Sequence, residues 1–120
     1  VLTESGELKG FHNSCLHRGR ALKSGRGVSH EIRCPYHGFC WHLDGRFKEA
    51  YCDWEFDEEA LSQLNLPEVQ VTSWGGWVLI NMDPEAPSFD EYASVLGEHF
   101  TRWAPEERYV SLHVEKGSNI

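Results

Sequence analysis

The sequence lacks any run of 18 consecutive apolar residues, and it contains neither an internal repeat nor a low-complexity tract. A membrane-spanning helix needs about 20 apolar residues, so none is expected and no membrane partner is predicted. Hydrophobic residues make up 40% of the 120 residues and charged residues 25%, which is ordinary for a soluble globular protein. The chain is therefore expected to form one complete domain at most, with a buried core of its own.

Positive charge is scarce, and it is unevenly distributed. The formal net charge is −8, yet residues 1–50 hold eight lysines and arginines against five acidic residues, while residues 51–120 hold three against fourteen. A chain with this overall charge would repel nucleic acid, which excludes that class of partner. The basic excess lies in 18–33 and forms either a docking surface or a solvated loop. Its members are Arg18, Arg20, Lys23, Arg26 and Arg33.

Cysteine is also scarce, but its placement is informative. Four cysteines could form two disulfides in a secreted protein. Cys15 and Cys34, however, are each followed within three residues by a histidine, His17 and His37. A disulfide scaffold does not require these histidines, and an intracellular metal site explains them better.

Alternating apolar residues and turn residues predict a mostly β chain up to residue 83. Asp44-Gly45 and Gly75-Gly76 are hairpin signals, and one helical turn is expected after Asp57. The expected strands are 1–3, 8–12, about 28–33, 39–43, 68–74 and 77–82.

An amphipathic helix is predicted beyond Pro84. Ser88 and Glu91 form a capping box, and apolar residues follow at helical spacing until Pro105. The stripe consists of Phe89, Tyr92, Ala93, Leu96, Phe100 and Trp103. We expect it to pack against another element, for which a second domain is a plausible candidate, rather than to bind a cofactor.

The metal-binding chemistry concentrates in two boxes, Cys15-Leu16-His17 and Cys34-Pro35-Tyr36-His37, separated by sixteen residues. Two cysteines and two histidines can hold one tetrahedral zinc ion. A zinc finger, however, usually has both cysteines in one knuckle and both histidines on a helix, whereas here each box is mixed. Mixed boxes suit a binuclear iron–sulfur site in which two thiolates hold one iron and two imidazoles hold the other. Such a cluster is neutral when oxidised, so it accepts an electron more easily than a dianionic four-cysteine cluster.

The segments FHNSCLHRG and CPYHGFCWHLDGRF, which contain these boxes, resemble the Rieske 2Fe-2S domain. Arg20 and Tyr36 stand where respiratory Rieske proteins have an extra pair of cysteines, so the resemblance is to the oxygenase and ferredoxin branch. The later segment LPEVQVTSWGGWVLINMDPEAPSFDEY resembles the passage into the catalytic domain of Rieske non-haem iron oxygenase large subunits. The resemblance implies a fragment. Residues 1–84 would be a Rieske-type antiparallel β domain with two cluster-binding loops and missing first strands, and 85–120 the truncated start of an α+β catalytic domain.

For the site, the resemblance implies that Cys15, His17, Cys34 and His37 bind a Rieske-type 2Fe-2S cluster, and that the chain holds no catalytic residue of its own. For the function, it implies electron transfer to a mononuclear Fe(II) in the missing domain of a ring-hydroxylating dioxygenase or monooxygenase of aromatic hydrocarbon catabolism. Electrons would come from NAD(P)H through a ferredoxin or flavin reductase. The full-length protein would be a cytoplasmic bacterial homo-oligomer, with or without a small subunit. A stand-alone Rieske ferredoxin is the alternative, and a structural zinc domain is a further one.

The remaining cysteines and histidines are expected not to bind the cluster. Cys40 lies on the strand beyond the second box and is expected to pack, and His42 is expected at the surface or at an edge. His12 and His30 are expected on strands flanking the first box, and Cys52 has no histidine in register. His99 and His113 are expected to be structural or exposed.

Overall fold

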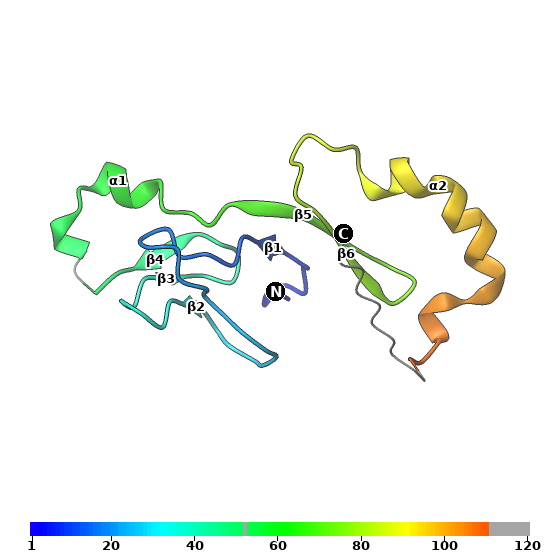
Figure 1. Cartoon of the computed structure of the whole chain (residues 1–120), viewed down its shortest axis with the longest axis horizontal. Coiled ribbons are helices and arrows are strands. Elements are labelled where there is room, and N and C mark those ends of the chain that lie inside the picture. Colours follow the sequence, from blue (N-terminus) through cyan, green and yellow to red (C-terminus); the bar gives the residue numbers. More distant parts are fainter. Residues whose placement is uncertain (52, 111–120) are drawn as a thin grey trace, which may run out of the picture. The chain divides into compact units, whose positions relative to one another are not determined.

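The structure, a computed structural model, describes residues 1–51 and 53–110 (Figure 1). Within these ranges the chain forms two compact units. The first comprises Val1–Val71 with Ile80–Ala86, and the second comprises Thr72–Leu79 with the described part of Pro87–Ile120. Two three-stranded antiparallel sheets and one long helix near the C-terminal end account for most of the regular structure, which confirms the expected mostly β fold class. No helix in the described ranges is long and apolar enough to cross a membrane.

One sheet carries the second Cys-His box. Its strands are β2 (Ile32–Arg33), β3 (Cys40–Trp41) and β4 (Phe47–Glu49), in the order β2-β3-β4. Ile32 pairs with Trp41 and Arg33 with Cys40, so the second box is the loop that joins β2 to β3. The connection from β3 to β4 is the expected Asp44-Gly45 turn, because Gly45 has a φ of 85° and the Arg46 amide donates to Asp44 Oδ1 at 3.1 Å.

The other sheet contains β1 (Gly10–Phe11), β5 (Glu68–Trp74) and β6 (Trp77–Asn81), in the order β1-β5-β6. Gly10 pairs with Val69, so β1 leads directly into the segment that carries the first Cys-His box. The turn between β5 and β6 is the expected Gly75-Gly76 hairpin, in which both glycines have positive φ, 56° and 86°. Both boxes are therefore connected to strands of a sheet, which limits where their loops can lie.

A hydrophobic cluster contains the cysteines of both boxes. Its buried members are Cys15, Leu22, Ile32, Cys34, Phe39, Trp41 and Leu66. Trp41 is fully buried, and its indole N–H donates to the carbonyl of Leu64. A buried aromatic side chain of this size contributes about 1.5–3 kcal/mol by leaving water. The two box cysteines are thus members of the core, and their positions depend on its packing.

The helices begin at side-chain caps. Asp57 accepts from the Ala60 amide at 2.7 Å at the start of α1 (Glu58–Ser62), the helical turn expected there. Ser88 accepts from the Glu91 amide at 3.3 Å at the start of α2 (Phe89–Phe100), as its position in the predicted capping box requires. The 3-10 helix η1 (Asp53–Glu55) precedes α1, and η2 (Thr101–Trp103) and η3 (Pro105–Glu107) follow α2.

Several elements are shorter than the sequence predicts. The helix expected to reach Pro105 ends at Phe100, and Ala104 adopts a left-handed conformation with a φ of 41°. Proline disfavours the helical region for the residue before it, which agrees with the non-helical conformation of Ala104 before Pro105. The strand expected over about 28–33 is reduced to Ile32–Arg33, and the strand expected over 1–3 is a single bridge from Leu2 to Leu8. Val28 is 97% exposed, and pairing begins only at Ile32, where Trp41 lies opposite.

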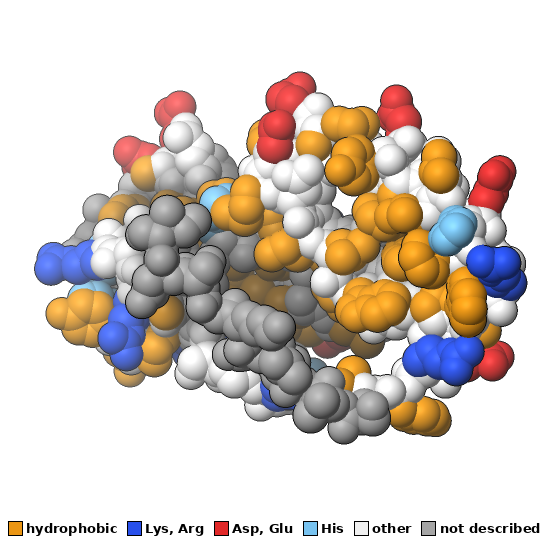
Figure 2. All heavy atoms as spheres, turned by 45° about the vertical axis from the view of Figure 1, so that its right-hand side comes forward, with side chains coloured by type: hydrophobic (Ala, Val, Ile, Leu, Met, Phe, Trp, Pro, Cys, Tyr) orange, Lys and Arg blue, Asp and Glu red, His pale blue; other side chains and the backbone are white. Residues whose placement is uncertain are grey.

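Hydrophobic side chains crowd the surface of the second unit, in the right half of Figure 2. Exposed members on β6 and on α2 and its extension include Trp77, Tyr92, Val95 and Trp103. In the same unit Trp74 packs on Trp77, Phe89 and Phe100, with ring centroids 5.9–6.1 Å apart. The aromatic stripe of α2 is therefore used for packing in part, as the sequence predicts, and part of it remains exposed. The domain boundary at residues 84–85 stays a prediction.

Candidate metal centre

The two boxes form loops with the same backbone design. In the first, the Cys15 amide donates to the carbonyl of Arg20 at 2.8 Å, and the Gly19 amide donates to the carbonyl of Cys15 at 2.8 Å. In the second, the Cys34 amide donates to the carbonyl of Phe39 at 2.8 Å, and the Gly38 amide donates to the carbonyl of Cys34 at 3.2 Å. Each loop is thus closed at its base and presents the residues between cysteine and glycine at its tip.

The glycine of each loop stands four residues after its cysteine and has a positive φ, 70° at Gly19 and 75° at Gly38. The spacing from the cysteine is the sequence signal for this shared turn, because each loop closes on the backbone of its cysteine. The histidines at the tips differ in register, since His17 is two residues after its cysteine and His37 three.

Replacing Gly38 by alanine should weaken the second loop. A left-handed backbone costs a residue with a Cβ about 1–2 kcal/mol, and the new Cβ would also touch Tyr51 at 3.4 Å. We expect a lower thermal unfolding midpoint and a reduced metal content for Gly38→Ala. Gly27→Ala is the matched control, because nothing lies within 4 Å of the added atom. Equal unfolding midpoints for the two variants would contradict the strained-loop account.

The two box thiols are buried side by side. Cys15 is 4% exposed and Cys34 is 2% exposed, and the two thiols interact with each other. Burial raises the pKa of the Cys15 thiol. Burial acts on Cys34 in the same direction, but the backbone amides of Tyr36 and His37 and the Cys15 thiol favour its thiolate, so the pKa of Cys34 lies below its ordinary value. The site therefore favours the thiolate form at Cys34 and the thiol form at Cys15.

Two imidazoles lie close together at the exposed loop tips. The ring centroids of His17 and His37 are 4.9 Å apart. Phe39 stacks on His17 at 4.8 Å, and Tyr36 stacks on His37 at 3.7 Å. Partial burial, followed by the nearby His37 and Arg18, lowers the pKa of His17, which favours its neutral form. A neutral imidazole keeps a nitrogen lone pair available for a metal ion.

A hollow of about 760 Å³ opens beside the second loop. It is lined by residues of that loop and by neighbours from the first loop, β2 and the segment before α1. The lining includes His17, Arg33, Cys34, His37, Tyr51 and Phe56. Three of the four predicted ligands therefore line this open hollow. They are His17 from the first loop and Cys34 and His37 from the second.

The donor set fits a 2Fe-2S cluster with two unlike ends. The two buried thiols would supply soft sulfur ligands for one iron, and the two imidazoles would supply nitrogen ligands for the other. The paired thiols and paired rings come from different loops, so each iron would join the loops together. The structure brings together all four residues that the sequence predicts as ligands, and their role as ligands stays a prediction.

The other cysteines and histidines in the described ranges belong to neither box. Cys40 is fully buried, in agreement with the expected packing role, and His12, His42 and His30 are exposed. His30 lies 3.8 Å from a carboxylate oxygen of Glu4. His99 packs edge-on against its neighbour in α2. Cys52 and His113 lie outside the described residues.

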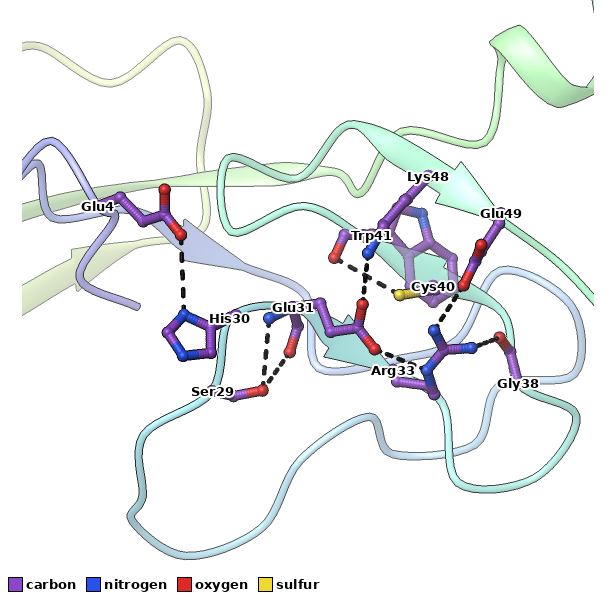
Figure 3. Close-up of polar contacts among 10 residues, drawn as sticks. All are labelled: Glu4, Ser29, His30, Glu31, Arg33, Gly38, Cys40, Trp41, Lys48 and Glu49. Atoms are coloured by element: carbon purple, nitrogen blue, oxygen red, sulfur yellow. Dashed lines mark hydrogen bonds and ion pairs between the residues drawn. The ribbon is translucent and has the colours of Figure 1, made fainter.

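A second group of possible metal ligands is occupied by ion pairs instead. Glu31, Cys40 and Glu49 have ligand atoms within 4.8 Å of one another. Figure 3 shows, however, that the carboxylates already accept hydrogen bonds from Arg33 and Lys48, at 2.6–2.7 Å. Sequence reasoning did not single out this network. Its members lie on or directly before β2 and on β3 and β4, and only the strand pairing brings them together.

Glu31 should make stability acid-sensitive. Hydrogen bonds from Arg33 and then Lys48 lower the pKa of Glu31 to about 2 from its usual value of 4.5. A carboxyl group whose folded-state pKa is depressed stabilises the fold above the unfolded-state pKa and loses that effect as pH falls through the folded-state value. We expect Glu31→Gln to unfold at lower urea concentration than the parent at pH 7, with the difference shrinking between pH 4.5 and 2. A difference independent of pH over that window would contradict this origin.

Comparisons with known proteins agree on one family. The family model described as the Rieske [2Fe-2S] domain matches residues 1–68, more than half of the chain. The carnitine monooxygenase oxygenase subunit of Escherichia coli (strain K12) is 37% identical over 109 residues, which are 88% of this chain and 28% of that protein.

Solved structures agree with the family match. The apo form of a quaternary ammonium Rieske monooxygenase, CntA, aligns with a TM-score of 0.73 and 30% identity over 85% of this chain and 30% of that chain. A naphthalene 1,2-dioxygenase variant aligns with a TM-score of 0.70 and 28% identity over 83% and 23%. The chain spans less than a third of each of these proteins.

Proposed function

The chain belongs to the Rieske [2Fe-2S] domain family, and we propose that it transfers single electrons through a cluster held by Cys15, His17, Cys34 and His37. The observation that carries this proposal is the meeting of two buried thiols with two adjoining imidazoles whose rings are 4.9 Å apart. The bound cluster would supply the one-electron chemistry. The cluster would have a buried end at the two cysteines and an open end at the two histidines.

The open end is suited to passing electrons. His17 and His37 are both exposed, so a donor or acceptor can approach their outer edges without displacing core residues. Phe39 and Tyr36 stack on the rings and limit how far each imidazole can rotate. The buried cysteines exclude water from the sulfur end. Electrons would therefore enter and leave at the histidine side, with the sulfur side protected.

The whole protein is proposed to be an oxygenase. In it the electron would pass to a mononuclear non-haem iron outside these 120 residues, after delivery from NAD(P)H by a ferredoxin or flavin reductase in the cytoplasm. The exposed aromatic and aliphatic side chains of the second unit support a larger protein, because such a surface is suited to packing against further chain (Figure 2). The proposed division is a Rieske domain over 1–84 and a connection over 85–120.

The substrate class is proposed from the relatives. The naphthalene 1,2-dioxygenase likeness supports the ring hydroxylation that the sequence resemblance implies. The carnitine monooxygenase subunit, 37% identical over 88% of this chain, supports oxygenation of a quaternary ammonium compound instead. The second reading has the stronger sequence support, so we propose a quaternary ammonium monooxygenase.

The test uses the full-length gene product purified without oxygen. We expect two irons and two acid-labile sulfides per Rieske domain, and an electron paramagnetic resonance signal that appears after uptake of one electron. Zinc in place of iron and sulfide would overturn the electron-transfer proposal. With reductase, NADH and oxygen, carnitine, choline and glycine betaine are compared with naphthalene by mass spectrometry. Product from naphthalene alone would overturn the substrate class but leave the electron-transfer proposal standing.

A further inference from the structure

We propose that Arg33 is a positioning residue that holds the second ligand loop, Cys34–Phe39, on the β2-β3-β4 sheet and thereby orients His37. The inference rests on the proposed cluster-binding function, which it deepens by naming what controls the orientation of one ligand. Arg33 is on β2, directly before Cys34. The Arg33 side chain makes no hydrogen bond to the thiol of Cys15 or Cys34. It would therefore act on the site through the loop.

The Arg33 guanidinium uses three different nitrogens on three acceptors (Figure 3). Nε donates to Glu31 Oε1 at 2.7 Å, and Nη2 donates to Glu49 Oε1 at 2.6 Å. Nη1 donates to the backbone carbonyl of Gly38 at 3.1 Å. The two carboxylates fix the plane of the guanidinium from opposite ends, and the third nitrogen is left aimed at the loop. A planar group with several donors can satisfy such divergent acceptors together.

A hydrogen bond to the Gly38 carbonyl restrains the loop backbone next to His37. Gly38 directly follows His37, and its amide already donates to the Cys34 carbonyl at 3.2 Å. The peptide groups on either side of Gly38 are thus both hydrogen-bonded, the amide to Cys34 and the carbonyl to Arg33. Together these two bonds restrain the backbone next to His37. At the tip, Pro35, Tyr36 and His37 are all exposed. Without the Arg33 contact, the His37 ring would be held by the backbone hydrogen bond between Gly38 and Cys34 and by its ring contacts with Tyr36 and His17.

The first loop has a counterpart that uses a different side chain. Asn13, two residues before Cys15, accepts from the Leu22 and Lys23 amides at 3.0 Å each through Oδ1. Its Nδ2 donates to the Lys23 carbonyl at 2.8 Å. In both loops a polar side chain one or two residues before the cysteine thus forms a hydrogen bond to backbone atoms that follow the cysteine. In the second loop this residue, Arg33, is on a strand of the sheet.

The charge of the Arg33 network indicates a geometric role. Lys48 Nζ donates to Glu31 Oε2 at 2.6 Å, so two cations face two carboxylates and the set as a whole is neutral. A neutral set changes the local potential at a cluster little, whereas a lost contact at Gly38 releases the loop directly. Lys48 also provides a matched control, because its removal takes one cation from the same network without touching the loop.

The experiment compares the parent with Arg33→Met, Arg33→Lys and Lys48→Met in the full-length protein with its cluster. Pulsed electron paramagnetic resonance of the reduced cluster measures the nitrogen couplings of both histidines, and absorbance measures cluster loss over time. For Arg33→Met we expect a broadened coupling for one histidine, an unchanged coupling for the other, and cluster loss about tenfold faster. Arg33→Lys should fall between this variant and the parent, because one ammonium cannot reproduce the three divergent contacts. Lys48→Met should match the parent in both measurements.

Three results would overturn the positioning role. These are parent-like couplings in Arg33→Met, equal broadening in Lys48→Met, or full restoration by Arg33→Lys. If Arg33→Met does not fold, Arg33→Lys decides, since a parent-like spectrum there refutes the role and a selective broadening supports it. Failure of the underlying function is distinguishable, because the parent itself would then lack iron, sulfide and the reduced-state signal.

Discussion

Alanine replacement of Cys15, His17, Cys34 or His37, one at a time, is expected to abolish the 2Fe-2S cluster. Each iron of such a cluster is four-coordinate, with two bridging sulfides and two protein ligands. Loss of one ligand opens a coordination position to water and exposes the sulfides to hydrolysis. The expected result is complete loss of the visible absorption and of the reduced-state electron paramagnetic resonance signal, with iron and sulfide falling together.

Cys40→Ala and His42→Ala are the matched controls for this series, because they change the same residue types close by in the sequence. Cys40 is fully buried beyond the second loop, and His42 is exposed. Both variants should retain the cluster, although Cys40→Ala should also lower stability somewhat because it leaves a small cavity. Loss of the cluster in Cys40→Ala together with its retention in Cys34→Ala would refute the ligand assignment.

The reduction potential of the cluster is expected to fall as pH rises through the alkaline range. A histidine that binds iron through one nitrogen keeps a proton on the other, and a bound cation lowers the pKa of that N–H. Ferric iron withdraws more charge than ferrous iron, so the pKa is lower in the oxidised state. Above the oxidised-state pKa, reduction takes up a proton together with the electron, and rising pH then disfavours reduction. The expected slope is about 59 mV per pH unit for each proton coupled to one electron.

The structure makes this pH dependence measurable in practice. His17 and His37 are both exposed, so their outer nitrogens exchange protons with water directly. Voltammetry of the full-length protein from roughly pH 6 to 11 covers the range in which a metal-bound imidazole should titrate. His42→Ala should give the same curve as the parent, because that histidine is not among the proposed ligands. A potential that stays constant over the whole range would contradict histidine ligation.

Much of the site is visible in the sequence because the interactions that build it are local. Each loop closes over five residues, between Cys15 and Arg20 and between Cys34 and Phe39. The donor types and their spacing therefore indicate a two-ended metal site before any fold is known. The caps at Asp57 and Ser88 and the Asp44-Gly45 turn are likewise formed by residues two or three positions apart.

Strand lengths and side-chain exposure could not be predicted as well, because they depend on partners distant in the sequence. Residues 28–31 have a pattern compatible with a strand, but pairing starts only where Trp41 lies opposite Ile32. The burial of Cys40 was expected, but its position between Glu31 and Glu49 was not. A periodic pattern indicates which side of a strand is apolar. It does not indicate how many of the residues will pair with a neighbouring strand.

The sequence by itself predicts which four residues bind a cluster, because a Cys-His box carries its donors and its loop-closing glycine within five residues. The tertiary structure decided how those donors are presented. It buried Cys15 and Cys34 in the core and left His17 and His37 exposed on one face. It also joined Arg33 to Glu49, sixteen residues away, and so connected the second loop to the sheet beneath it. Side chains that distant meet only when strand pairing sets their register, which no local pattern in the chain encodes.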